Sequence, residues 1–183
     1  MNTPGPGTLL IAEPFMKDPN FMRSVVLICE HQDEGSFGFV LNRLFENTLN
    51  ELMNDMDELT LPVYYGGPVQ VDTIHFLHQY PDLIPGSYEI LDGIFWGGDF
   101  QVAIELLREE KIDKSKIRFF LGYSGWGNGQ LDIELKEKSW LTATATRKLV
   151  FPRDVAELWK DALKHLGGDY VMMTNFPIDP QLN

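Results

Sequence analysis

The order in which strand and helix patterns follow one another is the feature that most limits how this chain can fold. Segments typical of strands come in runs, and amphipathic segments typical of helices separate those runs. Strict alternation of one strand with one helix would indicate a parallel sheet between two helical layers. Runs of strands indicate instead an α+β fold, with a mixed sheet that curls on itself.

The N-terminal part of the chain is dominated by strand patterns. Residues 8–13 predict a first strand, and the β-branched, apolar residues 23–30 predict a buried one. The turn-forming residues within 32–36 predict a hairpin whose second strand covers 37–41. Further strands are predicted at residues 62–65, 73–77, 88–90, 117–123 and 140–146.

Three segments carry the spacing of amphipathic helices. Residues 48–59 place leucine and methionine on one face and begin with a capping box of Thr48 and Glu51. A second helix is predicted to begin at Asp99, with its apolar side chains again on one stripe. The third covers 154–166 and is ended by the two glycines that follow it.

The chain has no repeat, low-complexity segment or long linker, so we expect one domain over residues 1–183. Its ends, 1–6 and 178–183, are expected to be loose. Residues 131–138 fit two structures. Their polar and apolar side chains alternate as in a strand, but two leucines four residues apart share a helical face.

Charge limits the partners of this protein. The net charge is −12, from 27 acidic and 15 basic residues, and the basic residues are scattered. Nucleic-acid binding needs clustered lysine and arginine to neutralise phosphates, so a DNA-binding face is disfavoured. An acidic protein is also repelled by anionic membranes. The expected partners are other proteins or a small ligand.

The location of the protein is expected to be cytoplasmic. The N-terminal apolar run, 9–12, is too short for a signal peptide, and no apolar run approaches the roughly 20 residues of a membrane helix. The single cysteine, Cys29, lies in a predicted buried strand and cannot form an intrachain disulfide, which suits a reducing compartment.

The sequence Gly122-Tyr123-Ser124-Gly125-Trp126-Gly127, here called the glycine block, resembles a serine-hydrolase elbow. An elbow needs glycine two residues before and two residues after the serine, whereas Trp126 occupies the second of these positions. The one histidine after Ser124 is His165, near the end of a predicted helix. The spacing favours a tight loop at a strand end, anchored by Trp126, and no catalytic residue is assigned.

Metal and nucleotide motifs are equally weak. His75 and His78 are three residues apart in a predicted strand, so their side chains point to opposite faces, and no cysteine pair supplies further ligands. Gly66-Gly67-Pro68 is too short for a phosphate-binding loop and lacks its lysine, and no dinucleotide fingerprint follows any strand. We therefore expect no metal and no cofactor.

The remaining candidates for a site are polar side chains at predicted strand ends beside glycines. The polar residues of this kind are Arg23, Glu30, His31, Asn42, Gln130 and Glu134. Each type is also a common structural hydrogen-bonding residue. Together with the glycine loops and their aromatic residues, they give these ligand-binding candidates: Arg23, His31, Asn42, Gly66, Gly67, Tyr123, Trp126 and Gln130.

Short motifs spread over nearly the whole chain carry a family resemblance. They are Gly7-Thr8-Leu9-Leu10-Ile11-Ala12, Pro14, Met16, Asp18-Pro19, Phe21, Arg23-Ser24-Val25-Val26, Glu30-His31, Gly38-Phe39-Val40-Leu41-Asn42, Gly66-Gly67-Pro68-Val69, Leu77-His78, Gly122-Tyr123-Ser124-Gly125-Trp126, Gln130-Leu131, Glu134 and Trp140. In this order they resemble the AlgH/YqgE family of bacterial proteins. The C-terminal residues 169–183 match no firm pattern of that family.

The resemblance implies an α+β fold, with a strongly bent sheet forming a pseudo-barrel and about four helices packed outside it. The name of the family points to a transcriptional regulator of alginate synthesis. The biochemical activity of the family is unassigned, so the resemblance implies no catalytic residues. Other members can carry alanine at the position of Ser124, which weakens the case for a serine nucleophile.

We expect a non-enzymatic regulatory or adaptor module that binds a protein or a small ligand through the loops near Asn42, Gly66 and Trp126. One alternative is a hydrolase-type enzyme that uses Ser124, Cys29 or the region of His31. The other is a direct DNA-binding regulator, which the net charge of −12 disfavours. The sequence does not predict the oligomeric state.

Overall fold

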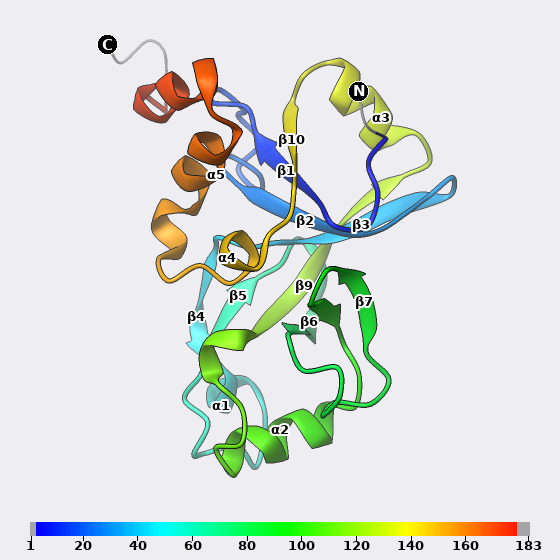
Figure 1. Ribbon diagram of the computed structural model, residues 1–183, viewed down its shortest axis with the longest axis vertical. Helices are drawn as coiled ribbons and strands as arrows, with labels where there is room; N and C mark the ends of the chain where they lie inside the picture. Colours follow the sequence, from blue (N-terminus) through cyan, green and yellow to red (C-terminus); the bar gives the residue numbers. More distant parts are fainter. Residues whose placement is uncertain (1–2, 179–183) are drawn as a thin grey trace.

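Ten strands form one connected sheet over residues 3–178, the part of the chain that this computed structural model describes (Figure 1). The strands are β1 (Thr8–Ala12), β2 (Val25–Gln32), β3 (Gly35–Val40), β4 (Leu44–Thr48), β5 (Pro62–Tyr65), β6 (Val69–His78), β7 (Tyr88–Leu91), β8 (Ile94–Trp96), β9 (Ile117–Gly127) and β10 (Trp140–Thr144). The α-helices are α1 (Leu49–Leu52), α2 (Phe100–Arg108), α3 (Gln130–Lys136), α4 (Arg147–Val150) and α5 (Leu158–Leu166), and 3-10 turns lie at Lys114–Lys116, Val155–Glu157 and Gly168–Asn175.

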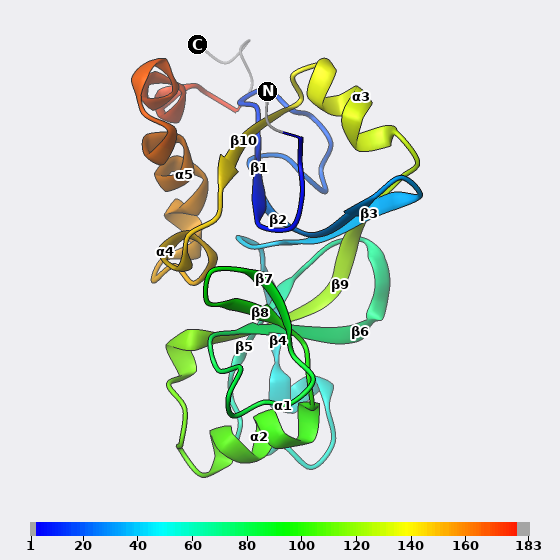
Figure 2. The same ribbon diagram turned by 45° about the vertical axis from the view of Figure 1, so that its right-hand side comes forward.

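The strand order is β10-β1-β2-β3-β9-β6-β8-β7, and β5 and β4 branch from β9. Neighbouring strands along that order run antiparallel, whereas β5 and β9 run parallel. The sheet curls strongly into a half-barrel, and the helices lie around its outside (Figures 1 and 2). The α+β class and the strongly bent mixed sheet that the sequence and its resemblance predict are confirmed.

Strand β9 joins the two halves of the molecule. Its residues 117–123 pair with β6 and β5, and its residues 124–127 pair with β3. Both ribbon views show β9 running from the lower group of strands to the upper one (Figures 1 and 2). Gly122, with a φ of 68°, lies where the partner strands change. The sheet therefore bends along its longest strand, where a glycine adopts a conformation that other residues rarely take.

In the upper half of the sheet in Figure 1, which contains β10, β1, β2 and β3, both faces are buried. In β2, Val25 and Leu27 pack in the cluster that α5 covers, whereas Val26 and Ile28 pack with Trp126 on the other face, beside α3. A strand buried on both faces reads as a continuous apolar run, which is the pattern of residues 23–30. In the lower half, α2 covers a separate cluster built on β5, β6 and β9.

The helix predicted over 48–59 is wrong beyond its first turn. The capping box of Thr48 and Glu51 is present, but α1 ends at Leu52 because Met53 is extended and Asp55 is left-handed, with a φ of 62°. Met56 still packs in the lower core, from an irregular loop. The periodic apolar side chains reach the core without a helix, so their spacing alone did not decide the structure.

Other segments differ from the prediction in smaller ways. Residues 130–136 form a helix, which settles the open assignment of that segment, and the last helix begins with a 3-10 turn before α5. Strands β4 and β8 and the short helix α4 carry no clear pattern in the sequence. The glycine block is not a loop after a strand, because β9 continues through it to Gly127.

The expected loose ends fall mainly outside the described residues, which leave out 1–2 and 179–183. Next to the first of these, the Thr8 amide donates to the Gly5 carbonyl at 3.0 Å and the Gly5 amide donates to the Thr8 hydroxyl, which closes a turn. No helix among residues 3–178 is long and apolar enough to cross a membrane.

Candidate functional site

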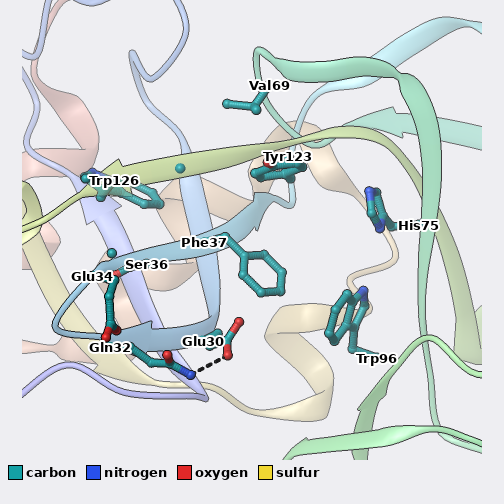
Figure 3. A pocket seen from close by; sticks show the side chains of 13 residues that line it. Glu30, Gln32, Glu34, Ser36, Phe37, Val69, His75, Trp96, Tyr123 and Trp126 are labelled. Carbon is teal, nitrogen blue, oxygen red and sulfur yellow. Dashed lines mark hydrogen bonds between the residues drawn. The ribbon is translucent and has the colours of Figure 1, made fainter.

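A pocket of about 640 Å³ opens beside the glycine block, between the hairpin of β2 and β3 and the strands β6, β8 and β9 (Figure 3). Its walls include the half-buried rings of Phe37, His75, Trp96 and Tyr123. Volumes of this size are usual for small-molecule sites. The pocket therefore offers aromatic surface to a ligand at the place where the two halves of the sheet meet.

The four rings follow one another around a common space (Figure 3). The ring centroids of Phe37 and Trp96 are 5.0 Å apart, those of Trp96 and His75 6.4 Å, those of His75 and Tyr123 6.0 Å, and those of Tyr123 and Phe37 5.9 Å. Each ring comes from a different strand. We call this arrangement the four-ring cage.

The cage rests on a rigid aromatic layer. Phe39 is fully buried and lies 5.3 Å from His75 and 6.1 Å from Phe37, measured between ring centroids. Phe39 in turn stacks on Phe120, at 5.2 Å. Side chains held by a packed layer keep their rotamers, so the cage is formed before any ligand arrives.

A β-bulge places a carboxylate at the edge of the cage. On β2, Ile28 lies opposite Gly38 and Glu30 lies opposite Phe37, so Cys29 is an extra residue without a partner on β3. Residues directly opposite each other in an antiparallel pair point to the same face. The bulge therefore turns Glu30 to the face of Phe37, whereas regular alternation would place it on the face of Ile28.

The charged side chains that line the pocket are both acidic. They are Glu30 and Glu34, and both are exposed. Glu30 accepts a hydrogen bond of 2.6 Å from the amide of Gln32 (Figure 3). Among residues 3–178, neither carboxylate forms an ion pair with a lysine or arginine. The pocket thus combines aromatic walls with uncompensated negative charge.

His75 contributes a neutral ring to the cage. Burial lowers the pKa of its imidazole below the ordinary value, because a charged ring would lose its hydration there. Its Nε2 atom lies 3.2 Å from the hydroxyl oxygen of Thr73. At neutral pH this side chain therefore presents an uncharged aromatic surface to the pocket.

The serine of the glycine block does not face this pocket. Ser124 is fully buried, and its hydroxyl donates to the carbonyl of Gly66 at 3.0 Å. That bond ties β9 to the loop before β6. The side chain of Trp126 is also buried, as the sequence predicts for an anchor, and it forms part of the pocket wall. The glycine block therefore has a structural role, and the ring of its Tyr123 lines the pocket.

Comparison with known proteins agrees with this fold. The model of the AlgH-like family matches residues 9–171 of the chain. The chain belongs to the AlgH-like family. Among its relatives, the "UPF0301 protein" of Chlorobium limicola is 46% identical over 97% of this chain and 95% of its own length. The one of Cytophaga hutchinsonii is 41% identical, over 97% and 98%.

Two solved structures of similar proteins extend the comparison. The solution structure of AlgH from Pseudomonas aeruginosa superposes with a TM-score of 0.73 and 29% identity, over 96% of this chain and 97% of that one. The crystal structure of a protein from Corynebacterium diphtheriae gives a TM-score of 0.79 at 22% identity, over 96% and 94%, and shows the fold alone. The resemblance read from the motifs is confirmed.

The predicted site residues of this AlgH-like chain fall into separate places. Tyr123 and Trp126 lie in the wall of the pocket. His31 points to the other side of the hairpin, where its Nδ1 atom is hydrogen-bonded to the hydroxyl of Ser36 beside a small hollow of about 70 Å³. Gln130 accepts a hydrogen bond from the Gly127 amide at 3.0 Å, at the start of α3.

The other predicted residues tie loops together. Asn42 accepts from the Val25 amide at 3.0 Å and donates to the Arg23 carbonyl at 2.9 Å. The guanidinium of Arg23 lies 4.5 Å from the ring of Trp159 and donates to the carbonyl of Phe176. Gly66 and Gly67 lie against the backbone of β9, with no room for a side chain. A ligand-binding role for these residues stays a prediction.

Three members of the cage were not predicted from the sequence to line a binding site. Phe37 looks like an ordinary strand residue, Trp96 lies in a segment without a clear pattern, and His75 drew attention only through its spacing to His78. Nothing local brings them together, because they belong to strands whose pairing spans the chain. Glu30 stood among the polar residues at strand ends, but its face depends on a bulge that the sequence does not mark.

His78 is unrelated to the cage and has a structural role. It is fully buried, and its Nδ1 atom accepts from the Tyr80 amide at 3.0 Å while Nε2 lies 2.9 Å from the Gly97 carbonyl. The ring therefore carries its proton on Nε2 and needs Nδ1 free. Among residues 3–178, no group of three or more acidic, histidine or cysteine side chains is placed to hold a metal ion.

We expect the free energy of unfolding to decrease as the pH is lowered from 7.5 to 5.5. Burial lowers the pKa of His78, against the smaller opposing effect of its bond to Gly97, and burial also lowers that of His75. Below about pH 6.5 the unfolded chain binds protons that the folded chain does not, so stability rises with pH in this window. Thermal unfolding at both pH values measures the change.

The variants H78N and H165N separate this effect from general acidification. Asparagine at 78 keeps an acceptor for Tyr80 but does not titrate, so it should reduce the dependence of the melting temperature on pH. His165 is exposed on α5, and its replacement should leave that dependence as it is. An unchanged slope in H78N would show that His78 does not control the acid response.

Proposed function

We propose that this AlgH-like chain is a non-enzymatic binding module, a regulatory or adaptor protein that takes a small ligand or part of a protein partner in the four-ring cage. The observation that carries the proposal is the cage itself. Half-buried aromatic rings around an open hollow gain from being covered by a ligand, and their packed support reduces the cost of ordering them. A preformed pocket of this kind recognises a molecule without needing to transform it.

The side chains that a hydrolase would need are occupied elsewhere. Ser124 is buried and hydrogen-bonded to a backbone carbonyl. Cys29 is buried, and burial, together with the charge of Glu30, raises the pKa of its thiol, which disfavours the reactive thiolate. His31 binds Ser36 on the far side of the hairpin from the cage. These contacts support a binding role over hydrolysis.

The charge of the chain supports an adaptor over a direct DNA-binding protein. A net charge of −12 disfavours binding to the phosphates of nucleic acid, which basic residues must neutralise. A link to transcriptional regulation, to which the family name points, is then exerted through a partner or a bound ligand. We place this activity in the cytoplasm, where the lone thiol of Cys29 stays reduced.

The proposal is tested with the fluorescence of Trp96. The chain has four tryptophans, and Trp126, Trp140 and Trp159 are buried, whereas Trp96 is half-buried in the cage. A panel of cationic, neutral aromatic and anionic amino-acid amides should include at least one class that changes this emission with saturation. Isothermal calorimetry then gives the affinity, and esterase, amidase and phosphatase substrates are screened in parallel.

Two variants serve as controls for the site. W96F keeps a ring but removes the reporter, so the emission change should disappear while calorimetric binding persists. Y88A removes an exposed ring that packs outside the cage, 6.2 Å from Trp96, and should leave binding unchanged. Turnover by the wild-type protein that H75A abolishes would contradict a non-enzymatic role. No binding by any class would contradict the binding module.

A further inference from the structure

We propose that the four-ring cage binds an organic cation, such as a guanidinium or quaternary ammonium group. The inference rests on the proposed function and names the ligand class of the same pocket. Two independent features point to it: the ring geometry and the sign of the charge at the rim. Neither feature alone would identify the ligand, since aromatic walls also take neutral rings.

The spacing of the rings fits a cation between them. Adjacent centroids are 5.0 to 6.4 Å apart around the cage. In a square with edges of this length the centre lies about 4 Å from each corner, within the roughly 6 Å reach of cation–π attraction. Cages of several aromatic side chains are a recurring solution for ammonium recognition.

Charge selects a cation over a neutral ligand. The bulge in β2 turns Glu30 to the face of Phe37, and Glu34 lies on the same rim. No lysine or arginine lines the described pocket. The ring of His75 remains neutral at pH 7, so it does not repel a cation. The net charge of −12 further raises the local concentration of cations around the protein.

The cation could belong to a free small molecule or to an arginine or lysine side chain of a protein. The pocket volume of about 640 Å³ accommodates either. The chemistry of the contact is the same in both cases. The experiment therefore tests the cation first and then compares the two sources.

The decisive probes are pairs that differ only in charge. Nα-acetylarginine amide is compared with Nα-acetylcitrulline amide, and choline with 3,3-dimethylbutan-1-ol, its uncharged isostere. Calorimetry at pH 7 and low salt should show that at least one cation binds about tenfold more tightly than its neutral partner. The preference should fall as ionic strength rises, because salt screens the exposed carboxylates.

Substitutions measure the contributions of the aromatic rings and of the rim charge to binding separately. W96A should weaken binding of the cation about tenfold, while E30Q should reduce the preference for the cation over its isostere about fivefold. E137Q removes the same charge at the exposed end of α3, away from the pocket, and should leave the preference unchanged. Circular dichroism of each variant confirms that it is folded.

The source is distinguished with a seven-residue peptide that carries one central arginine. Equal affinity for the peptide and the arginine amide would assign a free small cation, and much tighter binding of the peptide would assign a protein side chain. Both results support the inference. Equal binding of cations and neutral isosteres would overturn the cation inference but would leave the proposed binding function standing. No binding by any probe class would contradict both the cation inference and the binding function.

Discussion

Replacing Gly38 with alanine is expected to unfold the protein or to lower its free energy of unfolding by more than about 4 kcal/mol. A Cβ atom at this position would lie 2.1 Å from the Leu27 carbonyl oxygen and 3.1 Å from the Cα atom of Ile28. These are backbone atoms of β2, so they cannot move aside by a change of rotamer. Strand β3 lies between β2 and β9, and relief of the clash would break pairing on one side.

Ordinary propensity predicts the opposite sign at this position. Glycine within a strand is about 0.5–1 kcal/mol less favourable than alanine, so G38A would stabilise a strand with open space at this point. Gly38 is not in the left-handed region, so backbone strain is not the cause. The expected loss therefore reports the close approach of β2 to β3 alone, just before the bulge that directs Glu30 to the cage.

The matched control is G125A. Gly125 also lies in a strand, outside the left-handed region, and its Cβ would meet its nearest neighbour, Cε2 of Tyr123, at 3.7 Å. That is an ordinary contact, so G125A should match the wild type or exceed it by up to about 0.5–1 kcal/mol. Urea unfolding followed by circular dichroism compares the variants. A G38A protein as stable as G125A would show that the two strands are further apart than described.

The contrast between the two glycines shows what the sequence could predict. The strand pattern of residues 37–41 is local, and it placed β3 within a few residues of its true bounds. Whether a glycine in that strand is replaceable depends on Leu27, which approaches across the sheet. Turns, capping boxes and apolar runs depend on neighbouring residues, so the sequence predicted them correctly where contacts with distant segments do not override local propensity.

The failures have a common physical origin in contacts between distant segments. Residues 48–59 have helical spacing, yet the lower core draws Met56 inward from a loop. In the site, Tyr123 and Trp126 were identified beside glycines, but Trp96 and His75 were not. Their place in the cage follows from β6 and β8 pairing beside β9, a long-range arrangement that no local pattern encodes.

Glu134 explains why the glycine block and α3 occur together among the family motifs. One carboxylate oxygen, Oε1, accepts hydrogen bonds from the indole of Trp126 at 3.2 Å and from the indole of Trp140 at 3.0 Å. Both tryptophans are buried and belong to β9 and β10. Phe21 packs on both rings, at 6.0 and 5.6 Å. One side chain of α3 thus satisfies two buried donors on two strands.

Replacing Glu134 with leucine should lower the free energy of unfolding by about 2–4 kcal/mol. Each indole N–H would lose its acceptor, and an unsatisfied buried donor costs about 1–3 kcal/mol. E134Q keeps an acceptor oxygen in the same place, so it should cost less than about 1 kcal/mol. Urea unfolding measures both variants, and the tryptophan emission of E134L should change in the folded state.

The comparison of E134L with E134Q separates the hydrogen bonds from the charge. If the charge of Glu134 were what stabilises the fold, both variants would be destabilised alike and high salt would weaken the wild type. If the acceptor matters, only E134L is affected and salt has little influence, because short contacts to buried donors are poorly screened. The indole of Trp126 packs beside α3, whereas Phe37, Trp96 and Tyr123 of the cage pack on the other face of the sheet, so E134L should lower stability without changing binding in the cage. Weaker binding by E134L would show that the hydrogen bonds of Glu134 also support the cage.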